Sequence, residues 1–387
     1  MKTIVISAVN IRKGGTLTIL RNCLEYLSEL VQTGNYRVVA LVHKKELAYY
    51  PCIEYIELSW TIKSWFLRIW CEYVTMNSIS KQLSPVYLWL SLHDTTPNVK
   101  AERRAVYCHN PFPFYPWKWK ELLLNYRIVC FAWFSQYIYR INLHKNYRVL
   151  VQQQWIREEF MKMFHLPMEK IIVTLPTPVT SIPCMDKPKS QFKVYTFLYP
   201  SYGDIHKNFE LLCRATALLE KEIGHGRFKV ILTISGTENK YTQWLYKEWG
   251  KNESLEFAGF MDKKRIYDTY AQADCLVFPS KVETWGLPIS EFAEFGKPML
   301  LADLPYAHET AAGSQQTAFF APDDSERLKK YMKRLVLHDT SFLTAVPQQD
   351  IKMPKTSTWG ELFNRLLQRQ QTYQPMRGKC FQGAKEL

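Results

Sequence analysis

The stretch FPSKVETWGLPISEFAEFGKPM, residues 278–299, joins the end of an apolar strand to a helix that begins near Leu287. Gly286 in the turn allows backbone N–H groups at the helix start to approach an anion closely. Two carboxylates, Glu283 and Glu291, stand in the turn and about one turn into the helix. Because carboxylates accept pairs of hydroxyl hydrogens, the stretch is suited to holding a phosphorylated sugar. The alternative is a pair of solvated acids at a helix end.

The size and composition of the chain indicate two well-packed domains. Its 387 residues exceed the usual size of a single core, and 47% of them are hydrophobic and 14% aromatic. Nine cysteines are scattered without metal-ligand spacing, which predicts reduced thiols in a cytosolic protein and no metal site. The apolar run at residues 3–9 is expected to be a first buried strand and not a signal segment, because its basic residues follow it. No apolar stretch approaches the roughly 20 residues that a membrane-spanning helix needs.

The charge of the chain predicts an anionic partner. It carries 50 basic and 36 acidic residues, a net charge of +14. Nucleic acid is not expected, because no zinc-finger spacing, RNP-type strand or basic low-complexity tail accompanies the charge. Between residues 103 and 148, Lys and Arg alternate with Trp, Phe and Tyr, as in helices at a lipid interface. Peripheral contact with an anionic membrane is one expectation, and a solvated basic face over an aromatic core is the other.

Strands and helices alternate along the chain, which predicts an α/β protein with parallel sheets. The first strand is followed by Gly14, Gly15 and an apolar-periodic helix, the opening of a Rossmann-like unit. Prolines crowd residues 176–188 and indicate an interdomain linker. The expected division is a first domain at 1–176, a linker at 177–192, a second domain at 193–350, a C-terminal helix within 351–374 and a loose tail at 375–387.

The strand, turn, Gly286, helix and Gly296-Lys297-Pro298 stop together resemble the signature of retaining nucleotide-sugar glycosyltransferases of the group 1 (family 4) type. The resemblance covers nearly the whole chain. It implies the GT-B fold, in which two Rossmann-like domains with parallel sheets face a central cleft and the last helix crosses back onto the first domain. It also implies a retaining, metal-independent hexosyltransferase without a cofactor, whose donor substrate is a nucleotide-diphosphate sugar.

Three further runs resemble capsule-type members of this group. They are SLHDTTPN at 91–98, YCHNPFPFY at 107–115 and VQQQW at 151–155. The resemblance implies a lipid-linked saccharide acceptor, a role in surface-polysaccharide biosynthesis and a cytoplasmic location at the inner face of the cell membrane.

Departure of a nucleoside diphosphate requires positive charge on the leaving phosphates. Lys207, in YPSYGDIHKNFELL between a strand and a helix, is expected to supply it, with Ser201 beside it at the donor. Family members resemble this chain there but usually carry an arginine a few residues earlier. Residues 202–204 are Tyr, Gly and Asp, so either His206 or another lysine takes its place, or the donor geometry differs, or catalysis is weakened.

The resemblance also implies which groups meet the rest of the donor. Glu283 is expected at the donor sugar and Glu291 at the ribose, while the nucleobase is placed only by analogy. The remaining donor-side positions are Gly286 and Leu287 at the helix start, Gly259, Phe260 and Met261 near the base, and Gly14 and Gly15 from the first domain.

His109 follows a hydrophobic strand, at the end of a parallel sheet where ligands bind. Imidazole titrates near neutral pH, so it can donate to a sugar hydroxyl or share the acceptor's proton, and a structural histidine is the alternative. His93 and Asp94 end a neighbouring strand and, with Asn110, are expected to shape the acceptor side. No first-domain acid has the position of a nucleophile, and the family resemblance implies front-face attack assisted by the leaving phosphate.

Two other functions stay open. A nucleotide-sugar 2-epimerase shares the GT-B fold, but it would be expected to carry a set of first-domain acids and histidines that the sequence does not offer. The missing arginine is also compatible with a non-catalytic protein that binds a glycan or an active transferase.

Overall fold

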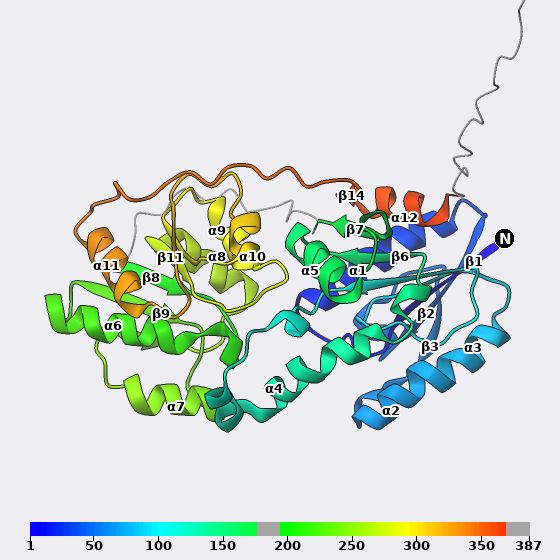
Figure 1. Ribbon diagram of the computed structural model, residues 1–387, viewed down its shortest axis with the longest axis horizontal. Helices are drawn as coiled ribbons and strands as arrows, with labels where there is room; N and C mark the ends of the chain where they lie inside the picture. Colours follow the sequence, from blue (N-terminus) through cyan, green and yellow to red (C-terminus); the bar gives the residue numbers. More distant parts are fainter. Residues whose placement is uncertain (176–193, 369–387) are drawn as a thin grey trace, which may run out of the picture.

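A computed structural model describes residues 1–175 and 194–368, which form two α/β units side by side (Figure 1). The predicted linker at 177–192 and tail at 375–387 lie outside these residues, as does the part of 351–374 beyond residue 368. Among the described residues, no helix is long and apolar enough to cross a membrane.

The first unit is built on an eight-stranded parallel sheet of order β14-β7-β6-β5-β4-β1-β2-β3. The strand order reverses between β1 and β4, which pair in parallel with Val5 opposite Trp89. In chain order the strands are β1 (Lys2–Ala8), β2 (Tyr36–Val42), β3 (Glu54–Glu57), β4 (Val86–Ser91), β5 (Arg103–Cys108), β6 (Arg148–Val151), β7 (Ile171–Thr174) and β14 (Lys355–Thr356).

Helices cover both faces of this sheet (Figure 1), so its strands are apolar with little alternation. A π-helical stretch (Cys71–Thr75) joins α2 to α3. The helices are α1 (Gly14–Val31), α2 (Trp65–Trp70), α3 (Met76–Gln82), α4 (Trp119–Arg140) and α5 (Gln154–Phe164). Short 3-10 segments are η1 (Lys45–Leu47), η2 (Ser59–Ile62), η4 (Phe112–Phe114), η5 (Leu143–Lys145) and η6 (Met168–Lys170).

The second unit has a six-stranded parallel sheet of order β10-β9-β8-β11-β12-β13, whose order reverses between β8 and β11. Its strands are β8 (Tyr195–Tyr199), β9 (Phe228–Leu232), β10 (Leu255–Phe257), β11 (Cys275–Phe278), β12 (Met299–Ala302) and β13 (Thr317–Phe320). Its helices are η7 (Ile205–Lys207), α6 (Phe209–Ile223), α7 (Lys240–Trp249), α8 (Lys263–Gln272), α9 (Leu287–Ala293), α10 (Pro305–Thr310) and α11 (Ser325–Val336).

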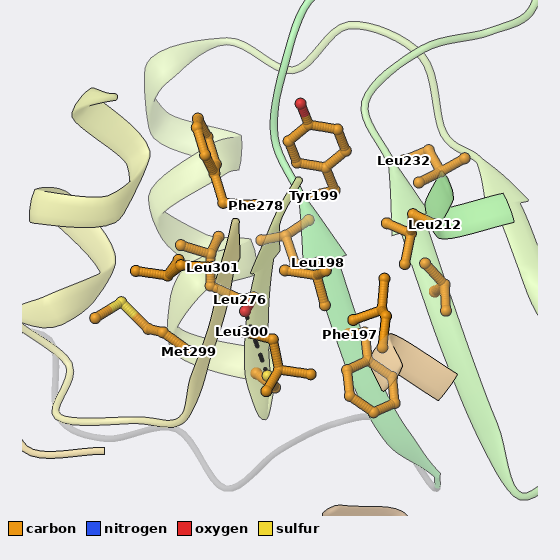
Figure 2. Packing of buried hydrophobic residues seen from close by; sticks show 14 of the residues in the cluster. Phe197, Leu198, Tyr199, Leu212, Leu232, Leu276, Phe278, Met299, Leu300 and Leu301 are labelled. Atoms are coloured by element: carbon orange, nitrogen blue, oxygen red, sulfur yellow. Dashed lines mark hydrogen bonds between the residues drawn. The ribbon is translucent and has the colours of Figure 1, made fainter. Parts of the chain in front are cut away.

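The core of the second unit fixes the two strands that flank its reversal. Phe197, Leu198 and Leu276 are buried between them, and the Tyr199 and Phe278 rings lie 5.5 Å apart at their carboxyl ends (Figure 2). The loops that leave β8 and β11 therefore start from adjacent, rigid positions.

After α11 the chain returns to the first unit (orange in Figure 1), where β14 pairs with β7. The last described helix, α12 (Trp359–Leu367), joins the core of that unit. Phe363 stacks on Tyr26 of α1 with ring centroids 5.5 Å apart, and the Tyr87 hydroxyl donates to the Leu367 carbonyl at 2.7 Å. The first and the last described elements, β1 and α12, therefore both belong to the first unit.

The helices α2 and α4 do not follow from sequence patterns. The α2 run WFLRIW is apolar on nearly all sides, and α4 mixes apolar and basic residues around its circumference, with a non-helical Asn125 inside. Without a one-sided apolar stripe, neither helix produces the period that predicts an amphipathic helix.

Candidate active site

Lys207 and Glu283 form an ion pair at the strand reversal of the second unit. The Lys207 Nζ lies 2.5 Å from the Glu283 Oε1, and both side chains are largely buried. Lys207 follows β8 and Glu283 follows β11, the two strands whose carboxyl ends flank the reversal. Ligands of doubly wound sheets bind in the crevice at that position. Two motifs that lie far apart in the sequence therefore form one charged centre.

Hydrogen bonds hold the Lys207 loop against the Glu283 loop. The Tyr199 hydroxyl donates to the Lys207 carbonyl at 2.7 Å and lies 3.1 Å from the Ser280 hydroxyl. The Asn208 side-chain amide, from a left-handed backbone position, donates to the Pro279 carbonyl at 3.0 Å. The ion pair is thus held by a polar network that spans both loops.

The glycine-containing starts of α1 and α9 face each other across the two units. A Cβ on Gly15 would lie 3.8 Å from the Leu287 Cδ1, although the two residues belong to different units. Gly14 and Gly286 both have positive φ, +69° and +80°, which favours glycine there. The predicted donor-side positions Gly14, Gly15, Gly286 and Leu287 are therefore brought together, with backbone N–H groups at two helix starts.

Glu291 lies on α9 and turns toward α8. It is mostly buried, and the Tyr270 hydroxyl donates to its Oε2 at 3.0 Å. Burial raises the pKa of the Glu291 carboxyl, while the Tyr270 hydroxyl opposes this shift. Its hydrogen-bond partner is thus on α8, whereas Glu283 pairs with Lys207 after β8.

The positions predicted for the nucleobase follow the edge strand β10. Gly259 has φ +74° and its N–H donates to the Ile234 carbonyl at 3.2 Å, while Phe260 is exposed. The Met261 sulfur accepts a hydrogen bond from Thr269 at 3.5 Å. The Ser201 N–H is committed to the Thr233 hydroxyl at 2.8 Å. An exposed aromatic ring at the same sheet end as Lys207 offers a stacking surface.

On the first unit, Asp94 braces the loop that carries His109 and Asn110. Its Oδ1 accepts from the backbone N–H groups of His109 at 2.7 Å and Asn110 at 3.1 Å. Its Oδ2 lies 3.6 Å from the His109 Nε2. Asp94 follows β4 and His109 follows β5, so the contact joins the ends of adjacent strands. The carboxylate orients the imidazole.

His93 is fully buried and does not reach the acceptor side itself. Its Nδ1 lies 3.0 Å from the Thr95 hydroxyl and 3.3 Å from the Glu72 Oε1, beneath the π-helical stretch. Burial lowers the pKa of His93 to about 4, so the ring is neutral at physiological pH. It can influence an acceptor only through its neighbour Asp94.

His206 does not replace the missing arginine. The side chain is buried, with its ring centroid 5.0 Å from that of Phe112 of the first unit. Burial, and secondarily the charges of Lys207 and Lys281, lower the pKa of His206 well below its usual value. A neutral, enclosed imidazole is poorly suited to neutralising a phosphate.

Lys281 joins the two units through two carboxylates. Its Nζ lies 2.9 Å from Glu121 of α4 and 2.9 Å from Glu210 of α6. Burial lowers the pKa of Lys281, but the two carboxylates outweigh it and the net shift is upward. Sequence patterns do not predict this cluster, because its three members are distant in the sequence and no spacing implies their contact.

Lys13 is the lysine of the first unit whose charge reaches the 202–207 loop. It is exposed and immediately precedes α1, whose start faces Leu287. Burial raises the pKa of Asp204, and the charges of Lys207 and then Lys13 oppose that shift. Lys13 and Lys207 therefore both act on Asp204, from opposite units.

A second junction fixes the orientation of the units. The Glu309 carboxylate of α10 accepts from the backbone N–H groups of Gln154 at 2.8 Å and Trp155 at 2.6 Å, at the start of α5. The fully buried Gln153 donates to the Thr310 hydroxyl at 2.8 Å. The VQQQW run thus serves as an interdomain contact, in which a carboxylate from one unit caps a helix of the other.

Comparison with known proteins relates part of this chain to glycosyltransferases. Residues 185–345 match the family described as glycosyl transferases group 1. The chain is 24% identical over 222 residues to O-antigen chain mannosyltransferase B of Escherichia coli. That alignment covers 54% of this chain and 57% of the relative, so the chain spans little more than half of that protein's length.

Solved structures share the architecture at low sequence identity. The lipopolysaccharide outer core galactosyltransferase WaaB in its apo form has a TM-score of 0.60 at 14% identity, covering 95% of this chain and 99% of that one. Alr3699/HepE of Anabaena in complex with UDP-glucose has a TM-score of 0.59 at 13% identity, covering 88% and 92%. Residues 185–345 are thus similar to group 1 glycosyltransferases, and the described chain has the two-domain α/β glycosyltransferase fold of the GT-B type.

Proposed function

We propose that this protein is a retaining glycosyltransferase that moves a sugar from a nucleotide-diphosphate donor to a saccharide acceptor in surface-polysaccharide biosynthesis. The observation that carries the proposal is the Lys207–Glu283 pair at the strand reversal, opposite the Gly14–Gly15 helix start. The family match over residues 185–345 supports the reaction class. The names of the mannosyltransferase and WaaB relatives support the polysaccharide context.

The donor diphosphate meets Lys207 and the N–H groups at the helix starts in this proposal. These groups are fixed before the reaction, so they stabilise the charge that develops on the leaving phosphate without reorganisation. Glu283, already beside Lys207, accepts hydroxyls of the transferred sugar. Glu291 accepts ribose hydroxyls and Phe260 stacks on the base.

Lys13 supplies the second positive charge on the diphosphate, in place of the arginine that the family usually carries. Three observations support this assignment. His206 is buried and neutral, Lys281 is committed to Glu121 and Glu210, and Lys13 shares the electrostatic environment of Asp204 with Lys207. Because lysines and backbone N–H groups provide this charge, we propose that transfer does not require a metal ion.

Attack occurs on the face from which the diphosphate leaves, and the leaving phosphate helps to take the acceptor's proton. Asp94 already accepts two backbone N–H bonds, which makes it a poor nucleophile. Its role is to orient His109 toward an acceptor hydroxyl. The acceptor is proposed to be a lipid-linked saccharide at the cytoplasmic face of the cell membrane, with the protein in peripheral contact with anionic lipid.

Release of nucleoside diphosphate from candidate donors tests the proposal. A thermal-shift panel of UDP-, GDP- and ADP-sugars first identifies the donor, because selective binding stabilises the folded protein. With that donor, Glu283→Gln should reduce release on the order of a hundredfold, since the sugar loses a charged contact. Glu294→Gln, exposed at the end of α9, is the matched control and should retain wild-type release.

Two results would overturn the proposal. Turnover by Glu283→Gln within a factor of about two of wild type would remove Glu283 from the donor site. Accumulation of an epimerised donor without release of nucleoside diphosphate would assign the chain to the 2-epimerases. Absence of turnover with every donor and acceptor, together with retained glycan binding, would make it a binding protein.

A further inference from the structure

Two helices of the first unit expose large apolar side chains on neighbouring surfaces. α2 and α4 lie side by side in Figure 1, and the rings of Trp65 and Phe131 are in contact with centroids 5.5 Å apart. Phe66 is 85% exposed and Leu123 is 88% exposed. The α2–α4 face comprises the exposed residues Trp65, Phe66, Ile69 and Trp70 of α2, and Leu123, Tyr126, Trp133, Phe134 and Tyr137 of α4. A folded protein rarely leaves such an apolar surface without a partner.

The exposed charges within the segments that form this face are of one sign. The carboxylates within residues 63–82 and 118–141 are Glu72 and Glu121, which are 2% and 6% exposed. Glu72 forms an ion pair with Arg68, and Glu121 forms one with Lys281. The cations described as exposed in these two segments are Lys63, Lys81, Lys118, Arg127 and Arg140, and Lys118 lies 3.9 Å from the Asp323 Oδ2. The surface therefore combines exposed aromatic rings and exposed cations with no exposed carboxylate in these segments.

We propose that the α2–α4 face docks on an anionic phospholipid bilayer. Trp and Tyr rings favour the boundary between water and acyl chains, where Lys and Arg meet anionic headgroups. A second copy of this chain fits less well. In a two-fold contact through the same face, Arg127, Arg140 and Lys63 of one copy would face the same set of cations of the other copy. No carboxylate of the face would be there to pair with them.

The face is continuous with the candidate active site. α4 runs from the exposed aromatic rings to Glu121, which contacts Lys281 two residues before Glu283. Docking through α2 and α4 would therefore place the candidate active site around Glu283 near the bilayer. This consequence rests on the proposed function, because it explains how a lipid-linked acceptor reaches His109 without leaving the membrane. Binding to lipid itself does not depend on catalysis.

The test is co-sedimentation of the full chain with vesicles of phosphatidylcholine alone or mixed with phosphatidylglycerol. The wild type should bind the anionic vesicles and not the neutral ones. Phe66→Ser/Leu123→Ser, at two exposed positions that contribute little to the core, should lower the partition coefficient at least about tenfold, because bilayer affinity scales with buried apolar area. Arg127→Gln/Arg140→Gln should lower it by a similar factor. Leu337→Ser, a 57% exposed leucine after α11, is the control and should bind as wild type.

The readouts separate docking from catalysis. The Phe66→Ser/Leu123→Ser variant should release nucleoside diphosphate from a soluble donor at the wild-type rate, so loss of vesicle binding alone supports the proposal. Equal binding of the wild type to neutral and anionic vesicles, or none to either, would overturn it. A wild-type dimer that this variant dissociates, without vesicle binding, would assign the face to self-association instead. Failure of the proposed function would appear separately, as no donor turnover with or without vesicles.

Discussion

Replacing Lys281 by methionine should destabilise the protein, at the junction between the two units, more than removing a surface ion pair would. The Lys281 Nζ lies 2.9 Å from carboxylates on both units, Glu121 and Glu210, and its side chain is only 16% exposed. Methionine keeps most of the length and apolar volume of lysine, so the change mainly removes the charge. Two carboxylates then face each other without compensation.

The magnitude follows from these distances. At 2.9 Å and an effective dielectric constant of about 20, each pair gains about 6 kcal/mol of Coulomb energy. Desolvation of the three groups offsets most of that gain. Removing one partner of a buried pair nevertheless costs about 3–5 kcal/mol, because an uncompensated charge stays buried. The pKa of Lys281 is raised above its usual 10.5, so this contribution is fully present below pH 10.5 and is lost only as pH rises through the folded-state pKa.

Urea unfolding at pH 8 of the wild type, Lys281→Met, Glu121→Gln and the double variant measures both the cost and the coupling between units. Lys162→Met removes an exposed pair with Glu159 and should leave the transition unchanged. We expect the double variant to be less destabilised than the sum of the single ones. A cost below about 1 kcal/mol for Lys281→Met, or additivity within about 0.5 kcal/mol, would refute a buried interdomain ion pair.

Two further predictions concern the diphosphate and pH. Lys13→Ala should reduce nucleoside diphosphate release about tenfold or more, and Lys13→Arg should largely restore it. Arg12→Ala should have little effect, because the Arg12 charge acts on His43. Equal losses for Lys13→Ala and Arg12→Ala would contradict the assignment. Burial lowers the pKa of His93 from 6.5 to about 4 and that of His206 well below 6.5, so only the unfolded chain takes up these protons as pH falls below 6.5. Unfolding free energy should therefore drop by about 1.4 kcal/mol per pH unit for His93 between about pH 6.5 and 4, with a further drop from His206 below pH 6.5. His93→Gln should reduce this slope in urea titrations, and an unchanged slope would show that His93 is not held neutral.

Sequence patterns were informative where a function depends on local backbone geometry. Residues 278–299 predict a strand, a glycine turn and a helix, and the structure has β11, a positive φ at Gly286 and α9 there. The parallel sheets were predictable because strands buried on both faces read as apolar runs separated by helices. Lys207 was predicted to lie between a strand and a helix, and it lies between β8 and α6, although its contact with Glu283 was not implied by spacing.

Contacts between distant side chains were not predictable. Lys281 meets Glu121 and Glu210 only because the loop after β11, the helix α6 and the helix α4 of the other unit converge, and no motif encodes that convergence. His93 and His109 both end a strand in the sequence, yet one turns inward to Glu72 and the other stays beside Asp94. The direction of a side chain at a strand end depends on the packing above it, which for His93 is an unpredicted π-helical stretch.

The most direct measurement is a crystal structure of the full chain with the nucleoside diphosphate that the thermal-shift panel selects. The account predicts that the diphosphate lies within about 3 Å of the Lys207 Nζ and of the backbone N–H groups at the Gly14–Gly15 helix start, with ribose hydroxyls at Glu291. A nucleotide bound elsewhere, with the Lys207–Glu283 pair unchanged and without a phosphate contact, would contradict it.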